Sequence, residues 1–428
     1  MKNANMICIV VSLILAVSCG LAAQQPATPP QAPGSVALDA ISWCSVLVSW
    51  QDNSADEESF IISRSEDALY TSVIEITTAA NTTSFIDRGT LSENSTYYYR
   101  VRAVNSAGDS AESTGGNVTT LSEPAAATGT LVADHSVINW VRQGNLEIPA
   151  ILAAKAALHI GYGHTSHGSQ LTDGMTGLVG FADGTGCESQ YTGTPGLFNW
   201  NRGGGGEALD LREGDGYGDG DLDHDAGYLA SDWETNGHQQ NWYLETREYL
   251  DNPANAEINV IMWSWCGQVS SQSEETMISN YLSLMEQLEE DYPDVTFIYM
   301  TGHLNGTGTE GNLHLRNEQI RQYCTDNNKW LFDFADIETY DPDGTFYGDH
   351  YPTDGCIYDA DGDGTPEYTD ETTPLDNDAN WAYDWQDAHT EGTDWYDCGA
   401  AHSVSVNANM KAYAAWWLWA RLAGWDET

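Results

Sequence analysis

The feature of the sequence that most constrains the fold is a repeated alternation of strand-like and helix-like segments after residue 157. Short apolar runs rich in β-branched and aromatic residues predict strands over residues 157–162, 258–263, 295–300 and 330–333. Apolar residues recur at helical spacing within residues 274–292, and further helices are expected over 312–327 and 407–423. This rhythm predicts a parallel sheet with right-handed crossovers, and therefore a three-layer α/β domain.

A different pattern precedes this region. Residues 46–50, 59–63 and 97–103 read as short strands separated by turn-rich spacers. A tryptophan on an early strand and a tyrosine just before the last long strand fit an all-β sandwich of two sheets. The run from Thr96 to Gly108 resembles the F strand and following turn of a fibronectin type III domain. The resemblance covers about residues 30–121 and implies a spacer or binding module.

The N-terminus is typical of an export signal. Lys2 provides a basic start, and the apolar run from Met6 to Val17 is too short for a permanent membrane span. The run ends in a segment that resembles a bacterial lipobox with Cys19 as the lipidated residue, although ordinary cleavage near Ala22 or Ala23 is the alternative. We therefore expect an exported protein, either a cell-surface or outer-membrane lipoprotein or a secreted one. The expected order is signal 1–23, linker 24–29, fibronectin type III domain 30–121, linker 122–129 and α/β domain 130–428 with acidic insertions.

The charge balance excludes several classes of partner. The chain has 15 basic and 64 acidic residues, for a net charge of −49. Such a surface repels nucleic acid and anionic membranes, so membrane contact is expected only through the possible lipid anchor. The charge suits a salty medium or a protein that binds divalent cations.

Export permits disulfides among the cysteines that follow the signal. Cys356 and Cys398 are the best candidate pair, because they bracket one long polar insertion near the C-terminus.

Reactive residue types follow the predicted strands of the α/β domain. The first strand runs into a glycine-rich turn in which the hydroxyl of Ser166 would be exposed, as a nucleophile requires. Gln268 follows the second strand and could meet an oxyanion, and His303 follows the third. Near the C-terminus, His402 offers a general base and Asp397 a carboxylate that could orient it.

This order resembles the SGNH (GDSL-like) hydrolase superfamily over about residues 131–425. The resemblance implies Ser166 as nucleophile, His402 as base, Asp397 as orienting acid and Gln268 as oxyanion donor. Its motifs differ here: His164-Thr165-Ser166 replaces Gly-Asp-Ser, and Cys266-Gly267-Gln268 replaces Gly-x-Asn-Asp. The spacing from Asp397 to His402 is two residues wider than in the usual pattern.

Several alternatives stay open at this point. Ser169 is a rival nucleophile, and Asp394 is close enough to replace Asp397. His164 and His167 are spaced His-x-x-His and could hold a metal instead. His164, His303 and Trp265 are candidate substrate contacts, although Trp265 is as compatible with the core as with a sugar platform. The tryptophans of the last helix are expected to pack in the core.

An acidic segment near the C-terminus predicts a calcium site. Residues 359–370 place acidic side chains at positions 1, 3, 5, 9 and 12 of an EF-hand-type loop, with glycine at position 6. The expected ligands are Asp359, Asp361, Asp363, Thr365 and Asp370. Residues 219–225 are a weaker second candidate. Calcium would be structural, and no organic cofactor is expected.

Together these features predict an exported serine esterase that removes O-acyl groups, such as acetyl, from an extracellular polysaccharide. The alternative is a non-catalytic surface protein that binds glycans and is stabilised by calcium.

Overall fold

The computed structural model describes residues 28–123, 131–184, 186, 191, 193–214, 222, 242–375 and 377–426. The predicted export signal with Cys19, most of both linkers, Cys187, and the acidic segment 219–225 apart from Leu222 lie outside these residues. Among the helices within the described ranges, none is long and apolar enough to cross a membrane.

The N-terminal part of the chain is a β-sandwich. One sheet has the strand order β1-β2-β5, and the other has the order β4-β3-β6-β7 with β8 paired to β6. The strands are β1 (Gly34–Ala40), β2 (Val46–Gln51), β3 (Ser59–Ser65), β4 (Ile74–Ala79), β5 (Ser84–Asp87), β6 (Thr96–Asn105), β7 (Gly108–Asp109) and β8 (Ser113–Thr119).

Two contacts explain why this sequence forms a sandwich of the fibronectin type III kind. The backbone N–H of Ser92 donates to the Tyr97 hydroxyl at 2.9 Å, which ties the start of β6 to the chain just upstream. Such a tyrosine corner is a hallmark of immunoglobulin-like sandwiches. Trp50, at the end of β2, is buried against Phe60 with ring centroids 5.4 Å apart. The predicted two-sheet sandwich is therefore confirmed.

The second domain is built on a seven-stranded sheet in which every pairing is parallel. The strand order is β11-β12-β10-β13-β14-β15-β9. The central strands β12-β10-β13-β14-β15 follow the order 2-1-3-4-5 of doubly wound domains, with the topological switch between β10 and β13. The strands are β9 (Val132–Ala133), β10 (His159–His164), β11 (Trp200–Asn201), β12 (Leu209–Glu213), β13 (Val260–Ser264), β14 (Thr296–Met300) and β15 (Trp330–Phe332).

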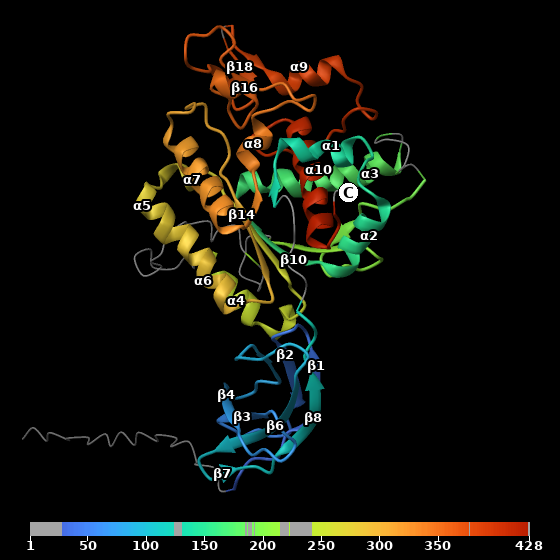
Figure 1. The fold of residues 1–428 in the computed structure, drawn as a ribbon, viewed down its shortest axis with the longest axis vertical. Helices are drawn as coiled ribbons and strands as arrows, with labels where there is room; N and C mark the ends of the chain where they lie inside the picture. The colour runs from blue at the N-terminus through green and yellow to red at the C-terminus, as the bar shows by residue number, and fades with distance from the viewer. Residues whose placement is uncertain are drawn as a thin grey trace, which may run out of the picture. The chain divides into compact units, whose positions relative to one another are not determined.

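Helices cover both faces of this sheet, as Figure 1 shows. One face carries α1 (Ile138–Arg142), α2 (Ile148–Ala157), α3 (Ser169–Asp183) and α10 (Ser405–Leu422). The other carries α4 (Trp242–Asp251), α5 (Glu274–Met277), α6 (Ser283–Asp291) and α7 (Asn312–Asn327). The predicted three-layer α/β domain is therefore confirmed.

Strand β13 contributes side chains to the hydrophobic cores on both faces of the sheet. Val260 and Met262 face the helices α3 and α10, whereas Ile261 and Trp263 face α4 and α6. Successive side chains of a strand point to opposite faces, so a strand covered on both sides must be apolar throughout. On α10, Trp416, Trp417 and Trp419 are fully buried, as expected.

Some element boundaries differ from the prediction. The first strand begins at His159 because Ala157 still belongs to α2. The helix expected over 274–292 is interrupted by a π-helical turn over Ile278–Leu282, between α5 and α6. Helix α7 has the predicted bounds.

A polar insertion between β15 and α10 completes the domain. Its elements are α8 (Phe334–Glu338), η7 (Gly348–His350), β16 (Ile357–Tyr358), β17 (Tyr368–Asp370), β18 (Thr373–Pro374), β19 (Ala379–Asn380) and α9 (Trp381–Ala388). The expected Cys356–Cys398 disulfide is wrong, because both thiols are free. The Cys356 thiol contacts the Ser403 hydroxyl at 3.5 Å, whereas the Cys398 thiol contacts the Ser405 carbonyl oxygen at 3.8 Å.

Candidate active site

Ser166 lies directly beyond the carboxyl end of β10, beside the topological switch of the sheet. It begins the short helix η2 (Ser166–Gly168), which leads into α3. Gly168 makes this tight turn possible, because a Cβ there would lie 2.3 Å from the Cβ of His164 and 2.8 Å from that of Ser264. The carboxyl ends of strands at a switch point are where doubly wound domains bind ligands.

The structure brings Ser166 together with His402, which lies 236 residues further along the chain. The Ser166 Oγ is 2.9 Å from the His402 Nε2. On the other side of the ring, the His402 Nδ1–H donates to the Glu371 Oε1 at 2.8 Å. Serine, imidazole and carboxylate therefore form a chain of hydrogen bonds with the order of a hydrolytic triad.

The backbone of His402 is held in an unusual conformation. Its φ is +64°, in the left-handed region that residues other than glycine rarely adopt. Such a conformation costs on the order of 1–3 kcal/mol and persists only where the surroundings enforce it. Residues of this kind are concentrated at functional sites, so the strain agrees with the position of His402 beside Ser166.

The structure does not place the orienting acid expected from the sequence beside His402. The Asp397 carboxylate accepts from the Ser405 hydroxyl at 2.9 Å, and Asp394 accepts from the backbone N–H of Thr390 at 2.8 Å. Glu371, in the turn between β17 and β18, takes the place beside His402. Asp397 instead bonds to Ser405, the first residue of α10.

Gln268 is also not placed as expected. Its side-chain oxygen accepts from the backbone N–H of Cys266 at 2.6 Å, so the side chain folds back onto its own loop. The side chain that approaches Ser166 from this strand end is Cys266, whose Sγ lies 3.0 Å from the Ser166 Oγ. Ser169, the rival nucleophile, donates its hydroxyl to the Ser166 carbonyl oxygen at 3.0 Å.

The expected substrate contacts are buried. Trp265 is fully buried beside Trp242, Trp263 and Tyr281, so it belongs to the core. His164 is buried and paired with Glu213, with 2.9 Å between Nε2 and Oε1. His303 is buried beneath His167, with their ring centroids 3.9 Å apart. The structure therefore places none of these three side chains on an exposed surface beside Ser166.

A second hydrogen-bonded chain adjoins the first. The His167 Nδ1 is 2.7 Å from the Cys266 Sγ, and its Nε2 is 2.6 Å from the Asp354 Oδ2. The His167 ring also stacks on that of His402, with centroids 4.3 Å apart. The three residues come from η2, the end of β13 and the polar insertion.

The electrostatics of this second chain are unusual. Burial raises the pKa of the Cys266 thiol, but the hydrogen bond and positive charge of His167 outweigh burial and hold this pKa at about 6. Burial lowers the pKa of His167, but Asp354 and Cys266 outweigh burial and raise it to about 9. Both shifts favour a thiolate paired with an imidazolium.

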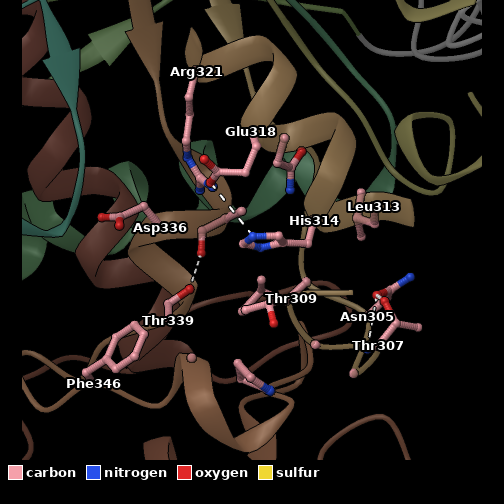
Figure 2. A pocket seen from close by; sticks show the side chains of 17 residues that line it. Asn305, Thr307, Thr309, Leu313, His314, Glu318, Arg321, Asp336, Thr339 and Phe346 are labelled. Carbon is pink, nitrogen blue, oxygen red and sulfur yellow. Dashed lines mark hydrogen bonds and ion pairs between the residues drawn. The ribbon is translucent and has the colours of Figure 1, made fainter. Parts of the chain in front are cut away.

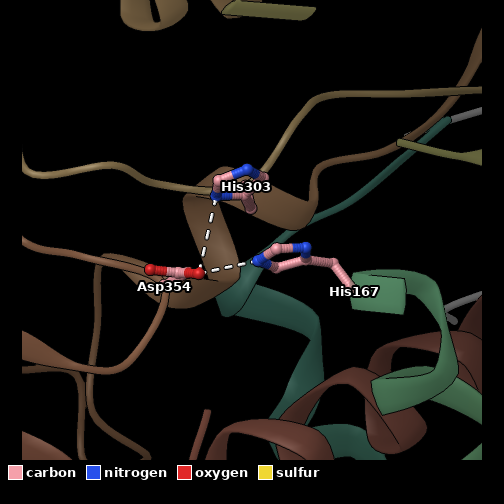
Figure 3. A group of neighbouring side chains, drawn as sticks. All are labelled: His167, His303 and Asp354. Carbon is pink, nitrogen blue, oxygen red and sulfur yellow. Dashed lines mark hydrogen bonds and ion pairs between the residues drawn. The ribbon is translucent and has the colours of Figure 1, made fainter. Parts of the chain in front are cut away.

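The structure does not pair His164 with His167 as the His-x-x-His spacing suggests. Instead, His167, His303 and Asp354 come together, as Figure 3 shows. The ligand atoms of one tetrahedral zinc would lie about 3.3 Å apart. The 2.6 Å between the His167 Nε2 and the Asp354 Oδ2 is instead a hydrogen-bond distance. His167 and Asp354 therefore share a hydrogen bond.

Sequence reasoning missed Glu371, Cys266 and Asp354. Cys266 carried a usable signal, because it follows the second strand of the sheet at the same edge as Ser166. Glu371 and Asp354 carried none, since both lie in an irregular polar insertion. Only the folding of that insertion over the strand ends brings them to the two histidines.

The predicted calcium loop, residues 359–370, lies between Asp354 and Glu371 in the sequence. Ligand oxygens of Asp359, Asp361 and Asp363 lie within 4.8 Å of one another. The Asp359 carboxylate accepts from the backbone N–H groups of Gly362 and Gly364, at 2.7 and 2.8 Å. The Thr365 hydroxyl donates to the Asp363 carboxylate at 3.0 Å. Asp370 lies on β17, where its carboxylate accepts from the backbone N–H of Thr373 at 3.0 Å.

A pocket of about 200 Å³ lies between residues 304–309, the start of α7 and residues 335–352 (Figure 2). His314, Glu318, Arg321 and Asp336 provide its charged wall. Its lining includes neither Ser166, Cys266 nor His402, so the pocket is separate from the reactive side chains.

Two solved structures to which part of this chain is similar are fn3 domains. The fn3 domain of the human collagen alpha-1(XX) chain is 15% identical and covers 25% of this chain and 99% of its own, with a TM-score of 0.22. The fn3 domain of human contactin 1 is 19% identical and covers 28% of this chain and 100% of its own, also with a TM-score of 0.22. No protein-family model and no curated protein matches the chain.

Proposed function

We propose that this protein is an exported serine esterase, related to the SGNH hydrolases, in which Ser166, His402 and Glu371 form the catalytic triad. The observation that carries the proposal is the continuous hydrogen-bond chain through His402, with 2.9 Å to the Ser166 Oγ and 2.8 Å to the Glu371 Oε1. In this role Glu371 replaces the aspartate that usually lies three residues before the histidine.

The chemistry follows from this geometry. With Nδ1–H held by Glu371, the His402 Nε2 is free to accept the Ser166 proton as the hydroxyl attacks an ester carbonyl. His402 then gives the proton to the leaving alcohol. A water molecule hydrolyses the acyl-enzyme by the same steps in reverse. The backbone N–H of Ser166, at the start of η2 and near the positive end of the α3 dipole, is the candidate oxyanion donor.

The openness of the site supports a large substrate. The side chains of Glu371 and His402 are 61% and 31% exposed, and Ser166 is exposed as well. The insertion that carries Glu371 also exposes the rings of Tyr351, Tyr368 and Tyr383. Exposed aromatic rings can stack on sugar rings, which supports an acylated extracellular polysaccharide as substrate.

Hydrolysis of 4-nitrophenyl acetate and release of acetate from an O-acetylated xylan would test the proposal. We expect Ser166→Ala to lose a thousandfold or more in kcat on both substrates with an unchanged fold. Ser169→Ala is the matched control and should keep most of the activity. Full activity of Ser166→Ala on both substrates would contradict the proposal.

A further inference from the structure

The hydrogen-bonded group of Cys266, His167 and Asp354 lies outside the proposed serine triad, and yet it has the order of a cysteine-hydrolase triad. A thiol, both nitrogens of one imidazole and a carboxylate are joined by contacts of 2.7 and 2.6 Å. The backbone N–H of His167 adds a third contact, 3.3 Å from the Cys266 Sγ. The Cys266 sulfur and the Asp354 carboxylate can both accept a hydrogen bond from the His167 ring. Both contacts are therefore best satisfied when each ring nitrogen carries a proton.

Cys266 differs from the other described cysteines in its surroundings. Burial raises the pKa of the Cys44 thiol to about 11, and those of Cys356 and Cys398 to about 12. It also raises the pKa of Cys324. Cys266 alone among them contacts an imidazole, and it is only half-buried. A thiolate in such surroundings is a nucleophile at neutral pH.

The charged groups around this pair favour its ionised form. His303 stacks on His167, and both burial and the charge of His167 lower the pKa of His303, so His303 adds no positive charge. Asp354 balances the imidazolium directly. Other titratable groups near the cluster, among the described residues, include His402 on the second face of His167, Glu371 behind His402, and Tyr162. Lys411, Glu338 and Cys356 interact with Asp354 from below.

The two nucleophilic atoms lie side by side. The Ser166 Oγ is 3.0 Å from the Cys266 Sγ and 2.9 Å from the His402 Nε2. The hydroxyl has a single proton and cannot donate it to both neighbours. Ionisation of Cys266 therefore decides which neighbour receives that proton. A carbonyl carbon within reach of one nucleophile is also within reach of the other.

We propose that Cys266, His167 and Asp354 form a second nucleophilic centre that accepts an acyl group as a thioester. The Cys266 thiolate attacks the carbonyl carbon of an acyl ester, which is either the substrate or the ester formed on Ser166. The C–S bond forms and the C–O bond breaks. The departing oxygen takes the proton of the His167 Nδ1. Water, or an acceptor alcohol or thiol, then takes the acyl group from sulfur, with His167 as base.

Alkylation of the full-length protein by iodoacetamide tests the thiolate without reference to esterase activity. We expect the rate at Cys266, followed by peptide mass spectrometry, to rise through pH about 6 and to be level above pH 7. Cys398 in the same protein is the internal control and should react slowly. Asp354→Asn and His167→Gln should both move the midpoint upward. A midpoint near 8.5, as for an ordinary thiol, would overturn the proposal.

Acylation tests the chemistry. Ser166→Ala treated with 4-nitrophenyl acetate should carry one acetyl group on Cys266, and neutral hydroxylamine should remove it. Ser166→Ala with Cys266→Ala should carry none. Unlabelled Cys266 in a Ser166→Ala variant that also shows no turnover overturns the second centre but leaves the serine esterase intact. Turnover that survives Ser166→Ala and disappears in the double variant overturns the serine nucleophile and supports the second centre.

The metal content of the untreated protein completes the test. One zinc ion per chain that blocks alkylation of Cys266 until a chelator is added would also overturn the proposal. It would turn the cluster of His167, His303 and Asp354 into a metal site.

Discussion

Gly355 lies so close to Glu371 that a Cβ on the glycine would be 1.6 Å from the Glu371 carbonyl oxygen. The same Cβ would be 3.5 Å from the His402 carbonyl oxygen. Gly355 follows Asp354 directly, so this one close approach holds together the backbones that carry both acids. The polar insertion thus positions two carboxylates at once.

The close approach leads to the first prediction. Gly355→Ala must push the Glu371 turn away, and with it the carboxylate that orients His402. We expect kcat on 4-nitrophenyl acetate to fall roughly ten- to a hundredfold, because the base loses its orientation. Gly180→Ala in α3 is the control, since a Cβ there meets nothing within 4 Å. An unchanged kcat in Gly355→Ala would show that the turn yields without moving Glu371.

The second prediction separates the two candidate acids. Glu371→Gln removes the charge that faces the His402 Nδ1, and we expect kcat to fall roughly ten- to a thousandfold with little change in KM. The Asp397→Asn variant should keep the wild-type kcat, because the Asp397 carboxylate accepts a hydrogen bond from the Ser405 hydroxyl. The reverse pattern in steady-state kinetics would restore the acid that the sequence suggested.

The third prediction concerns the base itself. His402→Ala should lose kcat to about the same extent as Ser166→Ala, because residues that act as one unit are not additive. The double variant should therefore be little worse than either single one. Fully multiplicative losses would mean that His402 does not act on Ser166.

The fourth prediction concerns a buried ion pair beneath the site. Lys411 of α10 and Glu338 of α8 are both fully buried and 2.8 Å apart. Burial lowers the pKa of Lys411 and raises that of Glu338, while their mutual attraction opposes both shifts. Glu338 also accepts from the backbone N–H of Leu304 at 2.7 Å, next to His303.

Lys411→Met leaves Glu338 buried without its cation. We expect the free energy of unfolding, measured by chemical denaturation, to fall by about 3–5 kcal/mol. Lys411→Met combined with Glu338→Leu should recover part of this loss. A double variant that is less stable than Lys411→Met would mean that the Glu338 contact to Leu304 outweighs the ion pair.

The fifth prediction concerns calcium in the loop of residues 359–370. A cation that binds only the folded loop would stabilise the protein by about 2.7 kcal/mol at a hundredfold excess over Kd. Chelation should therefore lower the melting temperature without abolishing turnover. Asp361→Ala with Asp363→Ala should reproduce this loss and make further chelation nearly neutral. An equal melting temperature with and without chelator in the wild type would reduce the segment to an acidic surface loop.

Local sequence determined the elements of this protein and the residues that lie at their ends. Continuous apolar runs such as Val260–Trp263 specify strands covered on both faces, because every side chain must be buried. A parallel sheet brings the carboxyl ends of its strands to one edge, so the position of Ser166 after β10 is readable from the order of elements. Helix α7 also has the bounds expected from the sequence.

Tertiary structure alone decided which partners meet at that edge. Glu371 and Asp354 lie in an insertion without periodicity, and their distances to His402 and His167 depend on how that insertion packs. Asp397 is closer to His402 in sequence than Glu371 is, but its carboxylate is taken by Ser405. Hydrogen bonds act over about 3 Å whatever the separation along the chain, so contacts between distant segments exist only after the backbone has closed around them.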